Sequence, residues 1–573
     1  MHGFFKRIVL IDLSRCTYQI RDTDPEVILN SLGGKGLGTH LLSQLNPRGV
    51  DPLSRDNHLI FATGPATGTL TWGSSRYGVF TKSPLTGLYA ESYSGGRVPE
   101  AVSATGFDAV VLCGRAQGPM VVDIRPEEIF FHDGSRLWGL DTFSTEQKVK
   151  DKYVQKDSRN WKSGCAVIGP AGENQAAFSI IKNDGWRCAG RAGTGAVMGS
   201  KNLKALVFQG DWKRPVYDPK ALKSIASDLA LDARDNPVVH AYKTMGTSQM
   251  VDVMNKAGAF PTKYWQYGTC SHWEKINAAA LHNQCRVTPH ACARCYLSCG
   301  RMTRVLNGRH RDLVIEGPEY ETIYAFGGLC MIDSIEEVIF LNHLCDFLGM
   351  DTITAGNLCA FAMEAWGRGK SGFEIRYGDT GKTAWLIAMI AQRKGVGDLL
   401  ARGIITTARE WGMEDEAVHV KGMEPAGYDP RVLKGMGLGY ATSDRGACHL
   451  RSTFYKPELA GMIPRDQIRG KAKLFVDFED RLIIFDTLIL CRFFRDIYGW
   501  SLLARLVHGL TGLDVGEKGL KKMASGIAHK VRQYNLQEGM KSCHEKLPLP
   551  LHRQLKDSGA VITQQDMDTM LHE

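Results

Sequence analysis

Three closely spaced cysteines are the sequence feature with the clearest chemistry. Cys292, Cys295 and Cys299 form a C-x2-C-x3-C triplet, and three thiolates this close can hold one face of an iron–sulfur cluster or a metal ion. The chain has no second C-x2-C pair and no H-x3-H pair, so a cluster is favoured over zinc, with unligated cysteines as the remaining alternative. A fourth ligand must come from elsewhere. Cys491 is attractive, but spacing alone does not select it.

Glycines and basic residues gather in other segments. Residues 183–201 place several glycines around Arg187 and Arg191, and glycine clusters at 33–38 and 94–97 carry similar chemistry. Glycine lets a ligand approach backbone N–H groups closely, and basic side chains suit phosphate. A dinucleotide-binding G-x-G-x-x-G pattern fails on spacing, and Walker A spacing is absent. Each segment alone is most often a turn with a solvated charge, but together they predict a phosphate-bearing redox cofactor that is not a nucleotide.

The composition is that of an ordinary globular chain. Its 573 residues are 43% hydrophobic and 23% charged, and 70 Lys and Arg against 61 Asp and Glu give a net charge of +9. This excess is small and scattered, so nucleic-acid binding is not expected, and disordered or small disulfide-rich classes are excluded. No apolar run approaches the ~20 residues of a membrane-spanning helix. The N-terminus lacks a signal-peptide pattern, so we expect a cytoplasmic protein with reduced thiols.

The secondary-structure pattern must bring these segments together. Short β-favouring runs separated by Gly, Ser and Pro turns occupy residues 8–13, 59–62, 78–81, 109–112, 166–168 and 205–208. Helical periodicity follows and predicts helices at 334–348, 354–366, 383–394, 396–411, 470–485 and 496–509. The pattern predicts an α+β fold, in which a β-rich, cofactor-cradling N-terminal domain precedes two mostly α-helical domains. The expected domains are 1–210, 211–425 and 426–573.

Longer motifs follow one another along nearly the whole chain. They are Arg76-Tyr77, Thr81–Gly87, Ser94–Gly96, Ile168–Asn174, Gly195–Ala205, Glu316–Glu321, Cys345–Thr352 and Gly437–Thr442. This series resembles the aldehyde:ferredoxin oxidoreductase family of tungsten enzymes. The resemblance implies tungsten or molybdenum held by two pyranopterin dithiolenes beside a [4Fe-4S] cluster, with Mg2+ between the pterin phosphates as a further candidate. It also selects the fourth cluster ligand, because the family's ligand positions match Cys292, Cys295, Cys299 and Cys491.

The resemblance further implies a set of cofactor contacts. In the N-terminal domain, the matching positions are Arg76, Tyr93, Gly95, Arg187, Cys188, Gly190 and Arg191. In the helical domains, they are Asp346, Met350, Asp351, Arg451, Asp486 and Leu490. Arginine suits phosphate, and aspartate suits the hydrogen-bond donors of a pterin ring.

Three positions depart from the family pattern. Tyr93 stands where the family usually has Asn, and Arg451 replaces a Lys, which is not a geometrically neutral change. The Glu-x-x-His iron site that bridges subunits in some members reads Phe340-Leu341-Asn342-His343 here. An oligomer is expected, but not one bridged by iron.

The activity that the resemblance implies is oxidation of an aldehyde to a carboxylic acid with water as the oxygen source. Glu321 and His449 match the family's acid–base pair, with Glu321 as general base and His449 as donor to the substrate oxygen. A buried pair that only supports the fold is the alternative. Electrons would leave through the cluster to ferredoxin or an iron–sulfur partner subunit. A basic run after the triplet is expected to dock this acidic carrier: Arg301, Arg304, Arg309, His310 and Arg311.

Two other functions remain open. The same fold and cofactors serve the tungsten catalytic subunit of dearomatising aryl-CoA reductase complexes. A non-catalytic iron–sulfur relay subunit would bind a cluster without tungsten, but the phosphate-contact arginines and the Glu321/His449 pair argue against it. The residues do not identify the aldehyde.

Overall fold

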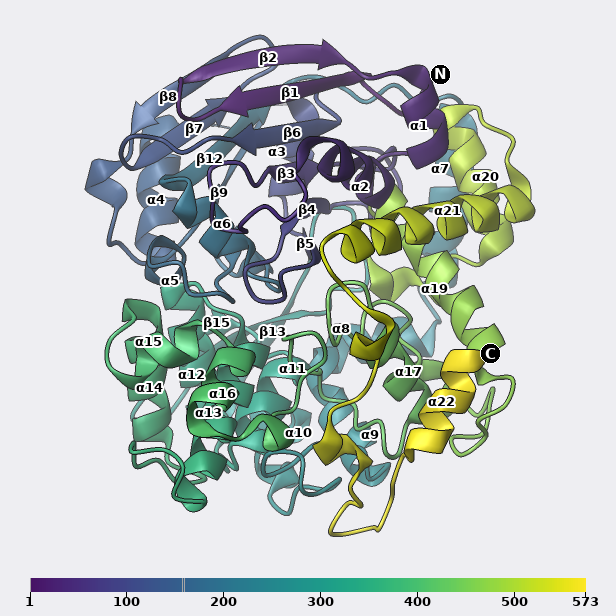
Figure 1. Cartoon of the computed structure of the whole chain (residues 1–573). Helices are drawn as coiled ribbons and strands as arrows, with labels where there is room; N and C mark the ends of the chain where they lie inside the picture. Colours follow the sequence, from purple (N-terminus) through teal and green to yellow (C-terminus); the bar gives the residue numbers. More distant parts are fainter. Residues whose placement is uncertain (1, 157, 159) are drawn as a thin grey trace.

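The molecule combines a β-rich N-terminal part with a mostly helical remainder. Figure 1 shows the computed structural model, which describes residues 2–156, 158 and 160–573. Strands fill the purple and blue region up to residue 210, and helices make up most of the green and yellow region. The expected α+β fold class is therefore confirmed. The division of the helical part at residue 425 stays a prediction.

Two six-stranded sheets form the N-terminal part. The first, in the order β2-β1-β6-β3-β4-β5, consists of β1 (Arg7–Asp12), β2 (Thr17–Asp22), β3 (Leu59–Ala62), β4 (Tyr77–Lys82), β5 (Tyr89–Ser94) and β6 (Ala109–Cys113). The second, in the order β11-β10-β9-β12-β7-β8, consists of β7 (Met120–Ile124), β8 (Ile129–Asp133), β9 (Lys162–Val167), β10 (Ile181–Asn183), β11 (Arg187–Ala189) and β12 (Leu203–Gly210). Neighbouring strands are antiparallel except β1 with β6 and β7 with β12. All six predicted strands are present.

Side chains of both sheets form one hydrophobic core. Phe61 of β3 and Phe208 of β12 have ring centroids 5.8 Å apart, and Val9 and Val122 belong to the same cluster. Strands β3 and β12 are buried along their whole length, which explains their continuous apolar sequences. This packing fixes the ends of β4 and β5, next to which Arg76 lies.

Helices cover the sheets and form the rest of the molecule. Those within the first 210 residues are α1 (Pro25–Ser31), α2 (Gly34–Leu45), α3 (Val98–Ala104), α4 (Thr142–Tyr153), α5 (Pro170–Glu173) and α6 (Thr194–Ser200). The following ones are α7 (Pro219–Asp232), α8 (Pro237–Met245), α9 (Met250–Lys256), α10 (Ala278–Gln284), α11 (Tyr320–Ile323), α12 (Ile335–Leu348), α13 (Thr352–Gly367), α14 (Thr380–Gln392), α15 (Val396–Ala401), α16 (Ile404–Trp411), α17 (Lys434–Thr442), α18 (Tyr455–Leu459), α19 (Lys471–Leu488), α20 (Trp500–Thr511), α21 (Gly516–Gln537) and α22 (Gln564–His572). Within the described residues, none of these helices has the length and apolar character that crossing a membrane would require.

The predicted helices are present, with one exception in detail. The stretch 396–411 forms two helices, α15 and α16, because Gly403 between them adopts a φ of +89°. This left-handed conformation favours glycine and ends a right-handed helix.

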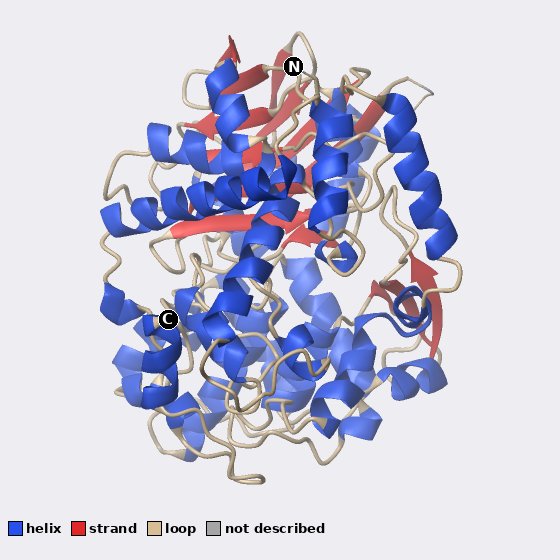
Figure 2. Ribbon diagram, turned by 90° about the vertical axis from the view of Figure 1, so that its right-hand side faces the viewer, coloured by secondary structure: helices blue, strands red, loops and turns tan. Residues whose placement is uncertain are grey.

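Two elements were not expected from the sequence. A three-stranded sheet, formed by β13 (Cys285–His290), β14 (Gly300–Val305) and β15 (Val314–Glu316), interrupts the helical part; Figure 2 shows it apart from the two large sheets. Helix α21 lies against α2, near the N-terminal sheets. At its end, Asn535 accepts a hydrogen bond from the backbone N–H of Tyr89 in β5, at 2.8 Å. The C-terminal residues therefore help to hold the N-terminal part.

Candidate functional site

The four predicted cluster ligands line one cavity. The cysteine triplet lies in the connection between β13 and β14, and Cys491 follows α19. Their side chains share a cavity of about 240 Å3 with Arg76 and Arg187. Gly73 joins the two segments, because its N–H donates to the Arg294 carbonyl at 2.7 Å and its carbonyl accepts from the N–H of Cys491 at 2.8 Å. No local sequence pattern indicates this role of Gly73.

The cysteine cavity suits a cluster better than a single ion. Among the described residues, no group of three or more His, Cys, Asp or Glu side chains is arranged to hold one metal ion. Thiols spread around a cavity match a cluster of several irons rather than tetrahedral zinc. Burial raises the pKa of Cys295 to about 12 and also raises the pKa of Cys292. A cluster that binds here would therefore displace protons from the thiols.

Two of the three glycine-rich segments reach this cavity, 94–97 through Gly95 and 183–201 through Arg187 and Cys188, but of their glycines only Gly95 is among the described residues that line it. A Cβ at Gly95 would lie 3.0 Å from the Sγ atom of Cys292, so a larger residue would intrude on whatever the cysteines hold. In the 33–38 cluster, a Cβ at Gly38 would collide with the ring of Phe80, and in the 183–201 segment a Cβ at Gly195 would lie 2.7 Å from the Ile180 backbone nitrogen. Close packing of α2 and α6 explains these glycines without a ligand.

A second, larger cavity of about 350 Å3 adjoins the first. The two share wall residues, among them Arg76, Tyr93, Cys188 and Cys491. Ten of the sequence-predicted catalytic and cofactor residues line the larger cavity: Arg76, Tyr93, Cys188, Gly190, Arg191, Glu321, Asp346, Met350, Asp351 and His449. Gly95 and Arg187 line only the cysteine cavity. Arg451, Asp486 and Leu490 line neither of these two cavities and lie behind their walls, so their predicted contact with a cofactor stays a prediction.

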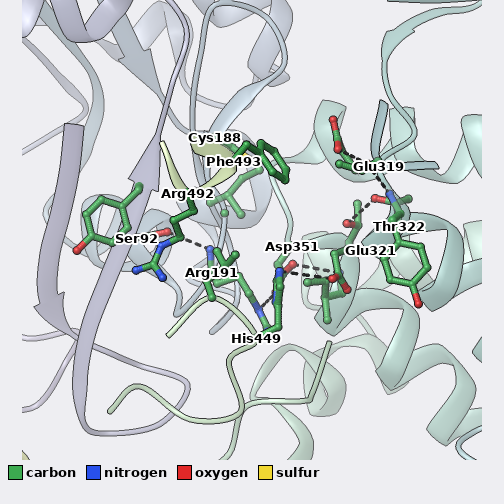
Figure 3. Close-up of a pocket in the computed structure, with 18 of the residues that line it drawn as sticks. Ser92, Cys188, Arg191, Glu319, Glu321, Thr322, Asp351, His449, Arg492 and Phe493 are labelled. Carbon is green, nitrogen blue, oxygen red and sulfur yellow. Dashed lines mark hydrogen bonds and ion pairs between the residues drawn. The ribbon is translucent and has the colours of Figure 1, made fainter. Parts of the chain in front are cut away.

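Glu321 and His449 face one another in the larger cavity. Glu321 belongs to α11, and its Oε1 lies 3.4 Å from Nε2 of His449; Figure 3 shows both side chains in the pocket. The other carboxyl oxygen, Oε2, accepts a hydrogen bond from the N–H of Gly427 at 2.9 Å. Among described residues, neither Oε1 of Glu321 nor Nδ1 of His449 has a hydrogen-bond partner. These two atoms are free to bind a ligand.

Burial sets the protonation of this pair. It raises the pKa of Glu321 to about 7, so this carboxyl can take up and release a proton at neutral pH. Burial, reinforced by nearby arginines, lowers the pKa of His449 well below its usual value. His449 is therefore neutral and can donate one hydrogen bond from its ring. A proton acceptor and a neutral donor thus lie side by side.

Arg191 connects the N-terminal part to the helical part. Its Nε donates to Asp351 at 3.1 Å, its Nη1 to the carbonyl of Ala447 at 3.2 Å and its Nη2 to the carbonyl of Glu424 at 2.8 Å. Asp351 also caps α13. These protein partners use most of the guanidinium, so a phosphate contact by Arg191 stays a prediction.

Asp346 and Cys188 both line the larger cavity. Asp346, on α12, accepts a hydrogen bond from Asn342 at 2.7 Å and lies 3.4 Å from Nζ of Lys182. Burial raises the pKa of Asp346 and raises that of Cys188 to about 12. Near Asn342, Phe340 stacks on His310 with centroids 4.2 Å apart. The residues at the family's iron-bridging positions thus contact neighbours within the chain, and the absence of a bridging iron stays a prediction.

A network of buried charges lies behind the N-terminal wall. Arg451 forms ion pairs with Glu91 and, at 3.1 Å, with Asp486, which also pairs with Arg492. Lys35 bonds to Glu91 at 3.0 Å. Burial alone would raise the pKa of Asp486, but Arg492 and Arg451 outweigh it and hold that pKa below its usual value. The sequence interpretation missed Lys35, Glu91 and Arg492, although Arg492 directly follows the fourth cysteine.

Several guanidinium nitrogens of this region have no partner. Buried nitrogens without a hydrogen-bond partner among described residues are Nε of Arg187, Arg445 and Arg451, Nη2 of Arg451 and Nη1 of Arg492. Unsatisfied buried donors are costly, and guanidinium groups bind phosphate well. Their surplus of donors fits an anionic cofactor.

The two substituted family positions are in contact. The hydroxyl of Tyr93 donates to Glu91 at 2.7 Å, and the Cζ atom of Arg451 lies 5.9 Å from the centroid of the Tyr93 ring. Tyr93 and Arg451 therefore share one carboxylate.

The expectation that the basic residues after the cysteine triplet dock an acidic electron carrier is partly wrong. Arg301 is buried and donates to backbone carbonyls, including those of Tyr242 and Thr244. Arg304 pairs with Asp312 at 2.8 Å, and Arg309 pairs with Glu337 at 2.5 Å. Because β14 directs Arg301 inward and acidic neighbours neutralise the others, the run is not a free positive patch.

Comparisons with known proteins place related sequences along nearly the whole described length of the chain. The sequence profile described as "Aldehyde ferredoxin oxidoreductase, N-terminal domain" matches residues 8–210, and that of "domains 2 & 3" matches residues 224–573. A tungsten-containing aldehyde ferredoxin oxidoreductase of Pyrococcus furiosus is 35% identical over 552 residues, which cover 94% of this chain and 90% of the relative. The aliphatic sulfonate oxidoreductase WOR-like subunit of the same organism is 27% identical over 474 residues, covering 78% of this chain and 75% of the relative.

A solved structure shares the fold. The active-site complex BamBC of benzoyl coenzyme A reductase, solved with 1,5-dienoyl-CoA, superimposes with a TM-score of 0.83 at 21% identity. The match covers 96% of this chain and 91% of that chain.

Proposed function

The chain belongs to the aldehyde ferredoxin oxidoreductase family, and we propose that it oxidises aldehydes to carboxylic acids. In the proposed reaction, an aldehyde and water give a carboxylic acid, two electrons and two protons. The aldehyde C–H bond breaks, and a new C–O bond forms with the oxygen of water. The electrons pass one at a time to an external iron–sulfur carrier, either a ferredoxin or a partner subunit.

The residues present fit the cofactors of that family. The unpartnered guanidinium nitrogens around Arg451 suit the phosphates of a tungsten bis-pyranopterin, and the four cysteines suit a [4Fe-4S] cluster. When bound, the tungsten group would supply the two-electron oxidant. Arg76 lines both cavities and donates to the Sγ of Cys491 at 3.6 Å, so it would lie between cofactor and cluster. A Mg2+ ion between the pterin phosphates remains part of the proposal.

Glu321 and His449 would handle the protons of this reaction. Because its pKa is raised to about 7, Glu321 can accept a proton from water or substrate without a large energetic barrier. His449, held neutral by burial, would donate a ring N–H to the aldehyde oxygen and orient the carbonyl. The contact between Oε1 and Nε2 at 3.4 Å places both functions within reach of one small molecule.

The observation that carries this proposal is the position of the Glu321/His449 pair in a buried cavity that adjoins the four-cysteine cavity. Replacing Glu321 with Gln keeps the size and polarity of the side chain but removes the base. We expect tungsten and iron contents to stay unchanged while kcat falls by about 10²- to 10⁴-fold. Full activity of the Glu321→Gln enzyme with both metals present would contradict the assigned role.

The alternative functions have less support. The benzoyl coenzyme A reductase complex resembles this chain at 21% identity, a likeness that concerns the fold alone. An iron–sulfur relay subunit would not require an acid–base pair next to the cysteines. Assays with benzaldehyde and acetaldehyde against an aryl-CoA thioester separate the enzymes, and tungsten absent with iron present would favour the relay.

A further inference from the structure

A buried arginine that lines the larger cavity makes no ion pair with a carboxylate of the described residues. Arg495 lines this cavity and is only 1% exposed. Its Nη1 donates to the carbonyl of Arg492 at 2.8 Å and its Nη2 to the hydroxyl of Tyr455 at 3.4 Å, while its Nε has no partner. No carboxylate oxygen in residues 2–156, 158 and 160–573 lies within 4.0 Å of the guanidinium. The neighbouring Asp496 is bound by Lys456 at 2.6 Å.

A row of aromatic rings leads from the acid–base pair to this arginine. His449 and Tyr428 have ring centroids 5.6 Å apart. Tyr428 stacks on Tyr455 at 4.1 Å with an interplanar angle of 10°, and Cζ of Arg495 lies 5.9 Å from the Tyr455 ring centroid. All four residues line the cavity. A ligand whose reactive end lies at His449 can therefore extend along this wall to Arg495.

The walls around this row are apolar. Met250, Ile353 and Phe493 line the same cavity, and the ring of Phe493 lies 4.8 Å from that of Tyr242. Tyr242, which also lines the cavity, interacts through its side chain with Arg495. Burial raises the pKa of Tyr242, so its hydroxyl stays a hydrogen-bond donor at all physiological pH values. The guanidinium and the two tyrosine hydroxyls thus lie together, beside the apolar side chains of Met250, Ile353 and Phe493.

Burying an uncompensated guanidinium is costly, and proteins usually supply a counter-ion. Here no carboxylate of the described residues reaches ion-pair distance, the neighbouring Asp496 acts on Arg495 only from further away while it pairs with Lys456, and the guanidinium borders a cavity. We infer that Arg495, with Tyr242 and Tyr455, binds a carboxylate at the far end of the substrate, so that the preferred substrates are aldehydes carrying a second, anionic group. A planar guanidinium matches a carboxylate in shape as well as in charge. This inference rests on the proposed aldehyde oxidation, because it names the substrate class of that site.

The test compares matched aldehydes on the purified holoenzyme with an artificial electron acceptor. The pairs are 4-carboxybenzaldehyde with 4-methylbenzaldehyde, and succinic semialdehyde with butanal. We expect kcat/KM for at least one carboxylated member to exceed that of its neutral partner by about tenfold or more. In Arg495→Gln, kcat/KM for the carboxylated member should fall by at least about 30-fold, because a buried ion pair loses one partner, while that of the neutral member should change little, so that the preference is lost. Arg495→Lys should retain part of it.

Arg481→Gln is the matched control. Arg481 is a half-buried arginine near Arg495, but it does not line the cavity, so the preference should be unchanged. Equal kcat/KM values within both substrate pairs in the wild-type enzyme would overturn the inference. So would a loss of tungsten from Arg495→Gln, which would assign the arginine to the cofactor instead.

A binding measurement separates this inference from the proposed function. If the holoenzyme contains both metals but oxidises no aldehyde, the proposed function fails. Calorimetric titration of the same holoenzyme with terephthalate and with 4-methylbenzoate then tests the arginine alone. If terephthalate binds more tightly than 4-methylbenzoate and this difference disappears in Arg495→Gln, the result supports a carboxylate-binding subsite at Arg495. Equal affinities of the wild-type enzyme for the two compounds refute it.

Discussion

On the N-terminal side of the larger cavity, buried charges lie against opposite charges, whereas on the helical side the carboxyl of Glu321 is surrounded by tyrosines. Behind the first wall, Arg451, Arg492 and Lys35 alternate with Glu91 and Asp486. At or behind the second wall lie four buried tyrosines whose pKa values are raised by burial and further by the charge of Glu321: Tyr320, Tyr324, Tyr428 and Tyr440.

The difference has a direct effect on proton affinity. Mutual neutralisation holds the pKa of Asp486 below its usual value despite burial, so this carboxylate stays charged and fixes its arginines in place. Desolvation without a close counter-ion raises the pKa of Glu321 to about 7. The same residue class is thus a permanent charge on one wall and a proton carrier on the other. One wall is suited to hold an anionic cofactor and the other to do chemistry.

The largest expected effect comes from the junction of the two walls, at Cys491. Cys491→Ser should remove one cluster ligand, so we expect iron content to fall sharply and electron transfer to a ferredoxin to drop by about 10³-fold or more. Cys16→Ser is the control, because Cys16 is exposed and remote from the four-cysteine cavity. Iron analysis and steady-state rates check this. Retention of the full iron content and rate in Cys491→Ser would show that the cavity holds no such cluster.

A smaller effect is expected within the charged wall. Asp486→Asn leaves Arg451 and Arg492 buried with too little negative charge, and breaking such a pair costs about 3–5 kcal/mol. The midpoint of urea unfolding should fall accordingly. Asp333→Asn is the matched control, because the Lys275–Asp333 pair is 62% and 60% exposed and should contribute less than about 1 kcal/mol. Equal losses of stability in the two variants would mean that Asp486 does not stabilise the buried Arg451 and Arg492 more than an exposed ion pair would.

Much of the fold followed from local sequence patterns, whereas the sites depended on long-range contacts. The buried strands and the longer helices could be predicted, because the spacing of their apolar residues is a local property of the sequence. The sheet that presents the cysteine triplet was missed, since β13 is largely exposed and β14, although mostly buried, carries Arg301 and Arg304 in place of an apolar run. Arg301 was interpreted as a surface charge, because nothing near it in the sequence reveals the carbonyls of α8 that receive its side chain.

The acid–base pair shows the same limit. Glu321 and His449 were named only through the resemblance to a family, because their contact joins segments far apart in the chain. Arg495 lay outside that resemblance and outside every local motif. A lone arginine in a sequence is most often a solvated charge, and only the three-dimensional arrangement shows that it is buried beside a cavity.

The smallest expected effect concerns the tyrosine wall and appears as a shift along the pH axis. If Glu321 must be deprotonated to act as a base, kcat/KM should fall tenfold per pH unit below about pH 7, where its pKa lies. After burial, which raises that pKa, and the Gly427 N–H and Arg191, which lower it, the nearby Tyr428 side chain lowers it further by stabilising the charged carboxylate. Tyr428→Phe removes this stabilisation of the charged form, so the acid limb of the profile should move to higher pH, by less than about one unit.

The direction of this shift distinguishes desolvation from charge compensation. On the tyrosine wall, losing a donor leaves the Glu321 carboxylate less stabilised. Glu321 then holds its proton more tightly, and the acid limb of the kcat/KM profile moves to higher pH. Tyr324→Phe is the control, because its hydroxyl donates to the carbonyl of Pro425 at 2.5 Å and not to Glu321, and its limb should stay in place. A downward shift in Tyr428→Phe, or an acid limb near pH 4.5 in the wild-type enzyme, would mean that Glu321 is stabilised as an anion like Asp486. The two walls would then not differ in the way proposed.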